Sequence, residues 1–306
     1  MVVAALLLNQ LHAFVSKFFM NWVKTNNIDK IYNFNFAKKN NQTPHALNAA
    51  IDTVIHISKN YPAPYTLFLS GGVDSQAMLW AFHLSKIPFQ TLSFVYNYNL
   101  NDHDLVTIKQ FADQHNICLN FNDFDLFNFL ETEFEQYSDR YLCGSPQICA
   151  FMKLADQIQE GTVIMSGNFI SNNHVTLPPN VMGLWHYQKL SGKSVIPFFF
   201  LETEDLAWAF NDYSIQINSQ NSFGLNYENR VNTYQHFNFP VISQGKKYNG
   251  FERVKEWFDA NYSKPIPIVN RISKKPGQGS NRIFDLLYRN KYEVKFSEYK
   301  YVYTYA

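Results

Sequence analysis

The residues with the clearest chemical potential are six consecutive ones, Ser70-Gly71-Gly72-Val73-Asp74-Ser75. Two adjacent glycines allow a tight turn and let a ligand approach the backbone closely. Successive N–H groups in such a turn form a concave site for anions, and the N-terminus of a following helix adds partial positive charge. The hydroxyls of Ser70 and Ser75 can donate to phosphate oxygens. These six residues, the 70–75 loop, therefore predict a phosphate-binding site.

Asp74 is the exception within the 70–75 loop, because a carboxylate repels phosphate. Its presence makes sense mainly as a ligand for a bridging Mg²⁺. The run lacks the Gly-x-x-x-x-Gly-Lys-Ser/Thr pattern of Walker A loops and the Gly-x-Gly-x-x-Gly pattern of dinucleotide sites. The sequence thus predicts a phosphate site of another kind, with Asp74 as its metal ligand.

The elements around the 70–75 loop alternate between strand and helix. Short apolar runs predict buried parallel strands, and runs with apolar residues on one face predict helices. Ser145 followed by Pro146 is typical of a helix start. The expected strands are 65–69, 89–96, 117–121 and 162–165, and the expected helices are 45–60, 75–85, 102–115, 127–137 and 145–157. This order predicts an α/β fold with a doubly wound parallel sheet and right-handed crossovers.

Three regions are expected along the chain. Residues 1–60 form an N-terminal helical segment, 61–170 an α/β domain around the 70–75 loop, and 171–306 a mostly helical and irregular C-terminal substrate or lid region punctuated by prolines. The N-terminal stretch carries an apolar helical stripe, which we interpret as packing on the domain or on a partner subunit. The stripe comprises Leu7, Leu11, Phe14, Phe18 and Trp22. Polar residues interrupt this stretch, so a membrane span is not expected.

The strand, the 70–75 loop and the helix together resemble the PP-loop signature Ser-Gly-Gly-x-Asp-Ser of the ATP pyrophosphatase superfamily. The resemblance covers roughly residues 45–170 and implies a Rossmann-like (HUP-like) fold with ATP and Mg²⁺ as cofactors. It implies cleavage of ATP between the α and β phosphates, with AMP and pyrophosphate as products. Val73 makes the run more similar to the asparagine, NAD and GMP synthetase group than to PAPS reductases. We therefore expect an AMP-forming ligase that resembles the ATP-pyrophosphatase domain of asparagine synthetase.

Two alternatives stay open at this point. One is sulfur transfer or nucleobase modification, as in tRNA thiolation, 7-cyano-7-deazaguanine synthase or PAPS reductase. That chemistry favours a CxxC pair, a zinc ribbon or a C-terminal cysteine, whereas the three cysteines here are Cys118, Cys143 and Cys149. The other is a nucleotide-binding regulator without turnover, against which the intact Asp74 argues.

Further ligand contacts are expected where parallel strands end. The resemblance implies that Phe94 and Tyr96 lie against the adenine, and that Gly167 and Asn168 let the backbone approach the nucleotide. Additional cations are expected from Arg140, ahead of a crossover helix, and from Lys274 and Lys275 in a glycine-containing segment, 273–282, that closes over the triphosphate. Together with Asp74, these three basic residues are the predicted catalytic set.

Composition limits the partners. The chain has 306 residues and a formal net charge of +1, with 26 basic and 25 acidic residues, so it carries no overall electrostatic signal for nucleic acid. Three cysteines without metal-ligand spacing indicate a reducing cytoplasm and no structural zinc. We expect a small-molecule acceptor as substrate, ammonia as one candidate nucleophile, and no membrane partner. Association into a homo-oligomer is left open.

Overall fold

The computed structural model describes residues 30–37, 44–141, 143, 145–167, 174–176, 179–217, 227–243, 253–254, 257 and 290–297. Within these ranges, none of the helices combines the length and apolar character that a membrane crossing requires. The apolar stripe between Leu7 and Trp22 lies outside the described residues, as do Asn168 and the expected lid over 273–282. The prediction of three regions with boundaries at 60 and 170 stays a prediction.

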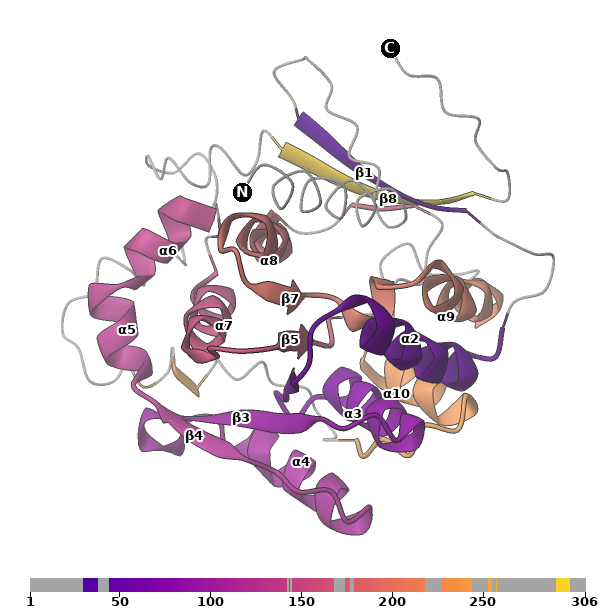
Figure 1. Ribbon diagram of the computed structural model, residues 1–306, viewed down its shortest axis with the longest axis horizontal. Helices are drawn as coiled ribbons and strands as arrows, with labels where there is room; N and C mark the ends of the chain where they lie inside the picture. The colour runs from indigo at the N-terminus through magenta and orange to yellow at the C-terminus, as the bar shows by residue number, and fades with distance from the viewer. Residues whose placement is uncertain are drawn as a thin grey trace, which may run out of the picture.

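A five-stranded parallel sheet organises the described part of the chain (Figure 1). Its strands are β2 (Tyr65–Phe68), β3 (Gln90–Tyr96), β4 (Phe121–Phe124), β5 (Thr162–Met165) and β7 (Ser194–Ile196). They lie in the order β4-β3-β2-β5-β7, and every neighbouring pair is parallel. The strand first in sequence is therefore central, and the chain order reverses beside it, between β2 and β5. This confirms the predicted doubly wound, Rossmann-like α/β fold.

Helices cover both faces of this sheet. They are α2 (Ala46–Asn60), α3 (Val73–Ser85), α4 (Asp102–Gln114), α5 (Leu126–Thr132), α6 (Phe134–Tyr141), α7 (Pro146–Gln157), α8 (Pro179–Leu190), α9 (Glu204–Ile217) and α10 (Tyr227–His236). One core joins the sheet to α5, α6, α7 and α8, and a second joins it to α2, α3, α4, α9 and α10. Figure 1 shows α5 and α6 on the left of the view and α2, α9 and α10 on the right.

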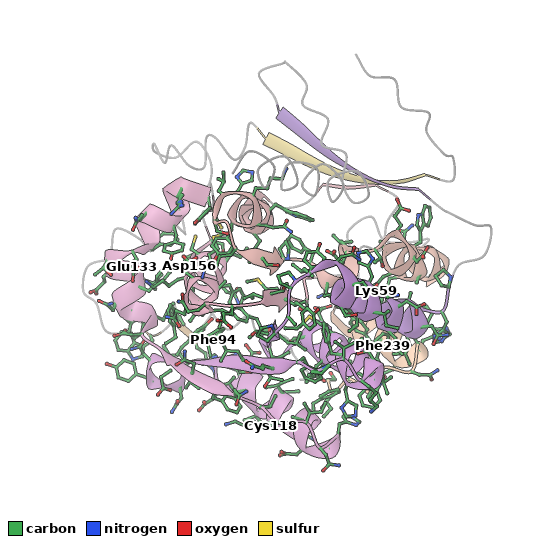
Figure 2. All side chains as sticks on the ribbon, in the orientation of Figure 1. Lys59, Phe94, Cys118, Glu133, Asp156 and Phe239 are labelled. Carbon is green, nitrogen blue, oxygen red and sulfur yellow. The ribbon has the colours of Figure 1, made fainter. Side chains whose placement is uncertain are left out.

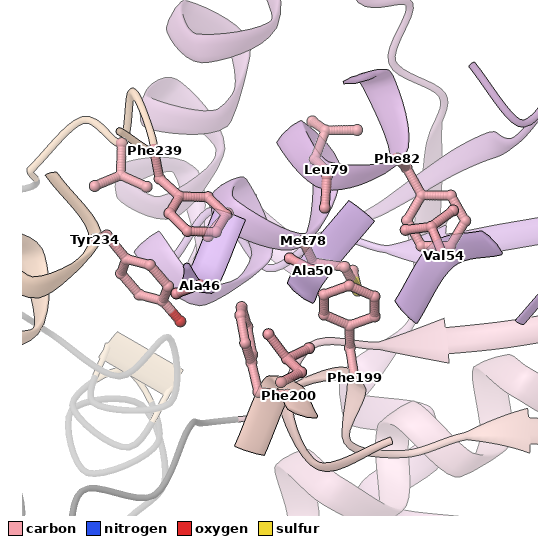
Figure 3. Packing of buried hydrophobic residues seen from close by; sticks show 14 of the residues in the cluster. Ala46, Ala50, Val54, Met78, Leu79, Phe82, Phe199, Phe200, Tyr234 and Phe239 are labelled. Carbon is pink, nitrogen blue, oxygen red and sulfur yellow. The ribbon is translucent and has the colours of Figure 1, made fainter. Parts of the chain in front are cut away.

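Alternation along each strand creates the two cores. In β2, Leu67 faces the α2–α3 side while Phe68 faces the α5–α8 side, and in β5, Ile164 and Met165 divide in the same way. All four side chains are buried. Figure 3 shows the second core, on the α2–α3 side, where Tyr234 and Phe239 lie close to Ala46 of α2. Burial on both faces explains why these strands are continuous apolar runs in the sequence.

The structure extends the predicted sheet by one strand. The helix α8 and the strand β7 continue the alternation beyond residue 170, and Val195 of β7 pairs with Val163 of β5. The third predicted strand is also displaced, from 117–121 to Phe121–Phe124. The start of the C-terminal region, with α8 and β7, therefore completes the five-stranded sheet. A separate three-stranded sheet joins β1 (Lys30–Ala37), β8 (Asn290–Ser297) and β6 (His174–Thr176), none of which the sequence patterns predicted.

A buried acid lies between α2 and α9. The Tyr61 hydroxyl donates a 2.6 Å hydrogen bond to the Glu202 carboxylate, and Glu202 is only 8% exposed. Burial raises the pKa of Glu202 from 4.5 to about 7, although the hydrogen bond from Tyr61 lowers it. A carboxyl group so placed favours its neutral form in the folded protein.

This acid predicts a pH dependence of stability. The pKa of Glu202 is higher in the folded state, so between about pH 4.5 and 7 the folded chain binds more protons than the unfolded chain. The stabilisation is fully present below the unfolded pKa and is lost as pH rises through 7. We expect the Glu202 contribution to fall by about 1–3 kcal/mol between pH 5 and pH 8. Glu202→Gln, which mimics the neutral acid, should flatten the Tm profile over this range. Equal slopes of Tm against pH for the unaltered chain and Glu202→Gln would contradict the raised pKa of Glu202.

Candidate functional site

The 70–75 loop lies at the carboxyl end of the central strand. It connects β2 directly to α3, whose N-cap is Gly72 and whose first turn contains Val73, Asp74 and Ser75. Beside it, β5 ends in register, with Met165 opposite Phe68. Ligands of doubly wound folds bind at the carboxyl ends of strands where the strand order reverses, and this loop occupies that position. The first amides of α3 have no partners within the helix and can bind an anion.

The two glycines of the loop differ in whether the fold itself requires glycine at that position. Gly71 has φ +86°, and a Cβ there would meet the Asp104 carbonyl oxygen of α4 at 2.0 Å. The fold itself therefore requires glycine at 71. Gly72 has φ −65° and ψ 158°, which any residue can adopt, and a Cβ there would meet only Ser70 Oγ, at 3.6 Å. Packing leaves open the space in front of Gly72, and a ligand approaching the backbone would use it.

Side-chain hydrogen bonds hold the loop in shape. Ser75 is buried and donates from its hydroxyl to the Gly72 carbonyl at 2.9 Å, and its Oγ lies 3.2 Å from Oγ of the exposed Ser70. The fully buried Gln76 donates from Nε2 to the Gly71 carbonyl at 3.0 Å. Gln76 also exchanges two hydrogen bonds with the backbone of Ile242, which lies beyond α10. These two bonds hold the segment after α10 against Gln76, the residue that directly follows the 70–75 loop.

Asp74 makes its described contacts with α10. Arg230 Nη1 donates to Asp74 Oδ2 at 2.9 Å, and the Tyr234 hydroxyl donates to Oδ1 at 2.8 Å. The Arg230 and Asp74 side chains are 16% and 10% exposed, so the ion pair is largely shielded from water. Burial raises the pKa of Tyr234, and the negative charge of Asp74 raises it further, so Tyr234 remains a neutral donor.

The described contacts of Asp74 are with hydrogen-bond donors, and its predicted role as a direct Mg²⁺ ligand stays a prediction. Both of its carboxylate oxygens accept hydrogen bonds, and the charge facing them is a guanidinium. A divalent cation on either oxygen would stand close to that positive charge in a poorly solvated place. Within the described residues, no group of three His, Cys, Asp or Glu side chains is placed to hold a metal ion.

The end of β3 packs as core. Phe94 and Tyr96 are 4% and 5% exposed, and the Phe94 ring meets Phe68 edge-on at 5.1 Å between centroids. Figure 2 labels Phe94 in the interior. Asn101 fixes the strand end, since its amide donates to the Phe94 carbonyl and its oxygen accepts from the Tyr96 N–H. A contact between these rings and adenine stays a prediction.

Of the remaining predicted site residues, the structure describes Gly167 and Arg140. Gly167 lies at the expected end of β5, but a Cβ there would meet Phe198 Cδ1 at 2.5 Å, so packing explains this glycine. Arg140 is exposed in the last turn of α6, with its guanidinium 5.2 Å from the Tyr141 ring centroid. The structure gives it no described contact with the 70–75 loop. Asn168, Lys274 and Lys275 lie outside the described residues.

Sequence patterns did not identify three residues that support the loop: Gln76, Arg230 and Tyr234. Gln76 directly follows the signature, and a fully buried glutamine needs partners for its amide. Arg230 and Tyr234 are four residues apart in α10 and so share one helical face. That spacing was a usable signal, but nothing local identified Asp74 as the partner of that face.

Comparisons with known proteins give only remote likenesses. Neither a protein-family model nor a curated protein sequence matches the chain. A structure of NMN synthetase from Francisella tularensis is 13% identical with a TM-score of 0.34, covering 78% of this chain and 100% of that chain. The U34-tRNA thiolase NcsA from Methanococcus maripaludis, solved with its 4Fe-4S cluster, is 12% identical with a TM-score of 0.32, covering 78% and 86%. Likenesses this remote carry no argument about activity, so the fold rests on strand order and the two covered faces.

Proposed function

We propose that the chain binds ATP at the 70–75 loop and cleaves it between the α and β phosphates. The observation that carries this proposal is the open Cβ position of Gly72, at the start of α3 where the strand order reverses. Neither backbone conformation nor packing requires glycine there, whereas close approach of a phosphate chain does. The resemblance of the loop to the PP-loop signature supports the same ligand.

The proposed reaction is adenylation of a small-molecule acceptor. An acceptor oxygen attacks the α-phosphorus, the bond from that phosphorus to the bridging oxygen breaks, and pyrophosphate leaves with the bond electrons. A nucleophile, ammonia being one candidate, then attacks the adenylated acceptor and releases AMP. The loop amides and hydroxyls would hold the phosphate tail in line and stabilise the charge that develops on pyrophosphate. An asparagine synthetase-like ligase is the specific form we propose.

The described contacts favour this reaction over sulfur transfer. Cys143 and Cys149 are both fully buried, and Cys149 Sγ donates to the Cys143 carbonyl at 3.4 Å. Burial raises the pKa of Cys149 well above its ordinary value, so this thiol lacks the thiolate character that sulfur chemistry needs. Cys118, which is exposed and precedes β4, is the chain's other cysteine.

The nucleotide products test the proposal directly. With Mg²⁺ and a panel of carboxylate acceptors with ammonia, the purified chain should convert α-labelled ATP to AMP and release pyrophosphate. The physical reason is that the loop amides and α3 are arranged to hold a leaving polyphosphate chain. Thin-layer chromatography of the nucleotide and an enzymatic pyrophosphate assay would measure both products.

Two results would count against it. ADP and orthophosphate as products would move the cleavage site to the γ-phosphate. Tight ATP binding without turnover on any acceptor would favour a nucleotide-binding regulator instead. Gly72→Ser serves as the matched variant, because serine is a good N-cap and leaves α3 intact while its side chain occupies the open space. AMP formation should fall in this variant with little change in Tm.

A further inference from the structure

Cleavage of ATP at the 70–75 loop would require positive charge beside the phosphates. The loop's own ionisable side chain, Asp74, is negative, whereas an ATP tail brings about four negative charges at neutral pH that must be balanced during pyrophosphate release. Lys274 and Lys275 lie outside the described residues, and Arg140 is exposed on α6. Arg230 is a cation that the structure does place against the loop, 2.9 Å from Asp74.

We propose that Arg230 binds the phosphate tail at the 70–75 loop and that Asp74 and Tyr234 position it there. The inference rests on the proposed function and identifies a cation for the same site. Arg230 thereby becomes a phosphate-binding residue supplied by α10. Asp74 acts as a positioning residue through this guanidinium.

The position of the guanidinium supports this assignment. Asp74 belongs to the first turn of α3, so its backbone N–H is one of the amides that would face a bound phosphate, while its own carboxylate holds Arg230. The cation therefore lies within one side-chain length of the phosphate-binding amides. A guanidinium carries five N–H donors in a planar fork, which suits contact with a carboxylate and a phosphate together.

The contacts also restrict how far Arg230 can move. Tyr234, one turn further along α10, donates to the other oxygen of Asp74, so the carboxylate is held on both sides. Gln76 fixes the chain after α10 through its two hydrogen bonds with Ile242. A cation held in advance loses little conformational freedom when the ligand arrives, and its partial burial strengthens the attraction.

Binding of inorganic pyrophosphate, measured by calorimetry with and without Mg²⁺, tests the proposal. Arg230→Ala should weaken binding by about 10- to 100-fold under both conditions, because a charge-assisted contact is lost. The pyrophosphate affinity of Arg230→Lys should lie between those of Arg230→Ala and the unaltered chain, because lysine keeps the charge but lacks the planar fork of donors. The exposed Lys59 provides the control, since Lys59→Ala removes one positive charge at the end of α2 that leads into the amino end of β2, and it should leave affinity unchanged.

A double variant guards against misfolding. Asp74→Asn combined with Arg230→Gln leaves no buried unpaired charge, so it should fold and still bind pyrophosphate weakly. Wild-type affinity in folded Arg230→Ala or in the double variant would overturn the role of Arg230 while leaving ATP cleavage intact. A loss in the double variant confined to titrations with Mg²⁺ would overturn it too, in favour of Asp74 as a metal ligand. If the unaltered chain bound neither pyrophosphate nor ATP, the proposed function itself would fail.

Discussion

Gly71→Ala is expected to cause the largest loss of stability of any single change in the 70–75 loop. The alanine Cβ would lie 2.0 Å from the Asp104 carbonyl oxygen, and the backbone at φ +86° disfavours any side chain. The backbone of α4 must move away, since neither atom belongs to a flexible side chain. We estimate a cost of about 2–5 kcal/mol from the strain and the clash. Thermal and urea unfolding of the two proteins would measure it.

The neighbouring glycine provides the comparison. Gly72→Ser has space for its Cβ and an allowed φ, so its free energy of unfolding should stay within about 1 kcal/mol of the unaltered chain. The two variants should therefore differ in what they affect: Gly71→Ala should lower the free energy of unfolding, and Gly72→Ser should weaken ligand binding. Equal stability of Gly71→Ala and the unaltered chain would mean that the loop does not rest on α4 as described.

Asp74→Asn is expected to reduce ATP turnover by at least 100-fold, which corresponds to about 3 kcal/mol of transition-state stabilisation. The amide keeps one acceptor oxygen but places an NH₂ donor against either the Arg230 guanidinium or the Tyr234 hydroxyl, both of which are donors. Arg230 then loses its anionic partner and its fixed position. Steady-state kinetics with a responsive acceptor would measure the loss in kcat and in kcat/KM.

Stability should change less than activity in this variant. The ion pair is shielded but not fully buried, so its loss should cost about 1–3 kcal/mol of unfolding free energy, and the chain should remain folded at 25 °C. Tyr234→Phe isolates the second contact, because it removes one hydrogen bond and no charge. We expect it to lower turnover less than Asp74→Asn does. Turnover of Asp74→Asn equal to that of the unaltered chain would remove Asp74 from the site altogether.

Local patterns predicted the centre of the fold well. The strand β5 has the predicted bounds, and α7 begins where Ser145 and Pro146 indicated, with the Ser145 hydroxyl accepting from the Ile148 N–H. The strand β5 is buried on both faces, and α7 begins with a strong capping signal. Local sequence therefore indicates both elements. The turn at the 70–75 loop was also predictable, because two consecutive glycines between an apolar strand and a helix favour a tight turn.

Elements at the sheet edges were harder to predict. The strand β4 is an edge strand whose first three residues, Phe121, Asn122 and Asp123, are exposed, so the apolar run just before it was the stronger signal. The strand β7 has three residues and ends before Pro197, too short for a periodic pattern. The contacts of Asp74 depend on tertiary structure alone, because Arg230 lies 156 residues away along the chain.

That separation has a consequence for biosynthesis. The hydrogen bonds that support the loop connect Asp74 with Arg230 and Gln76 with Ile242, across 156 and 166 residues. Contacts between such distant residues form late, since the intervening chain must first be ordered. A nascent chain that has left the ribosome only as far as β5 carries the entire glycine motif, but not the side chains that anchor it. The proposed nucleotide site can therefore be complete only after α10 and Ile242 have emerged, long after the motif itself has been translated.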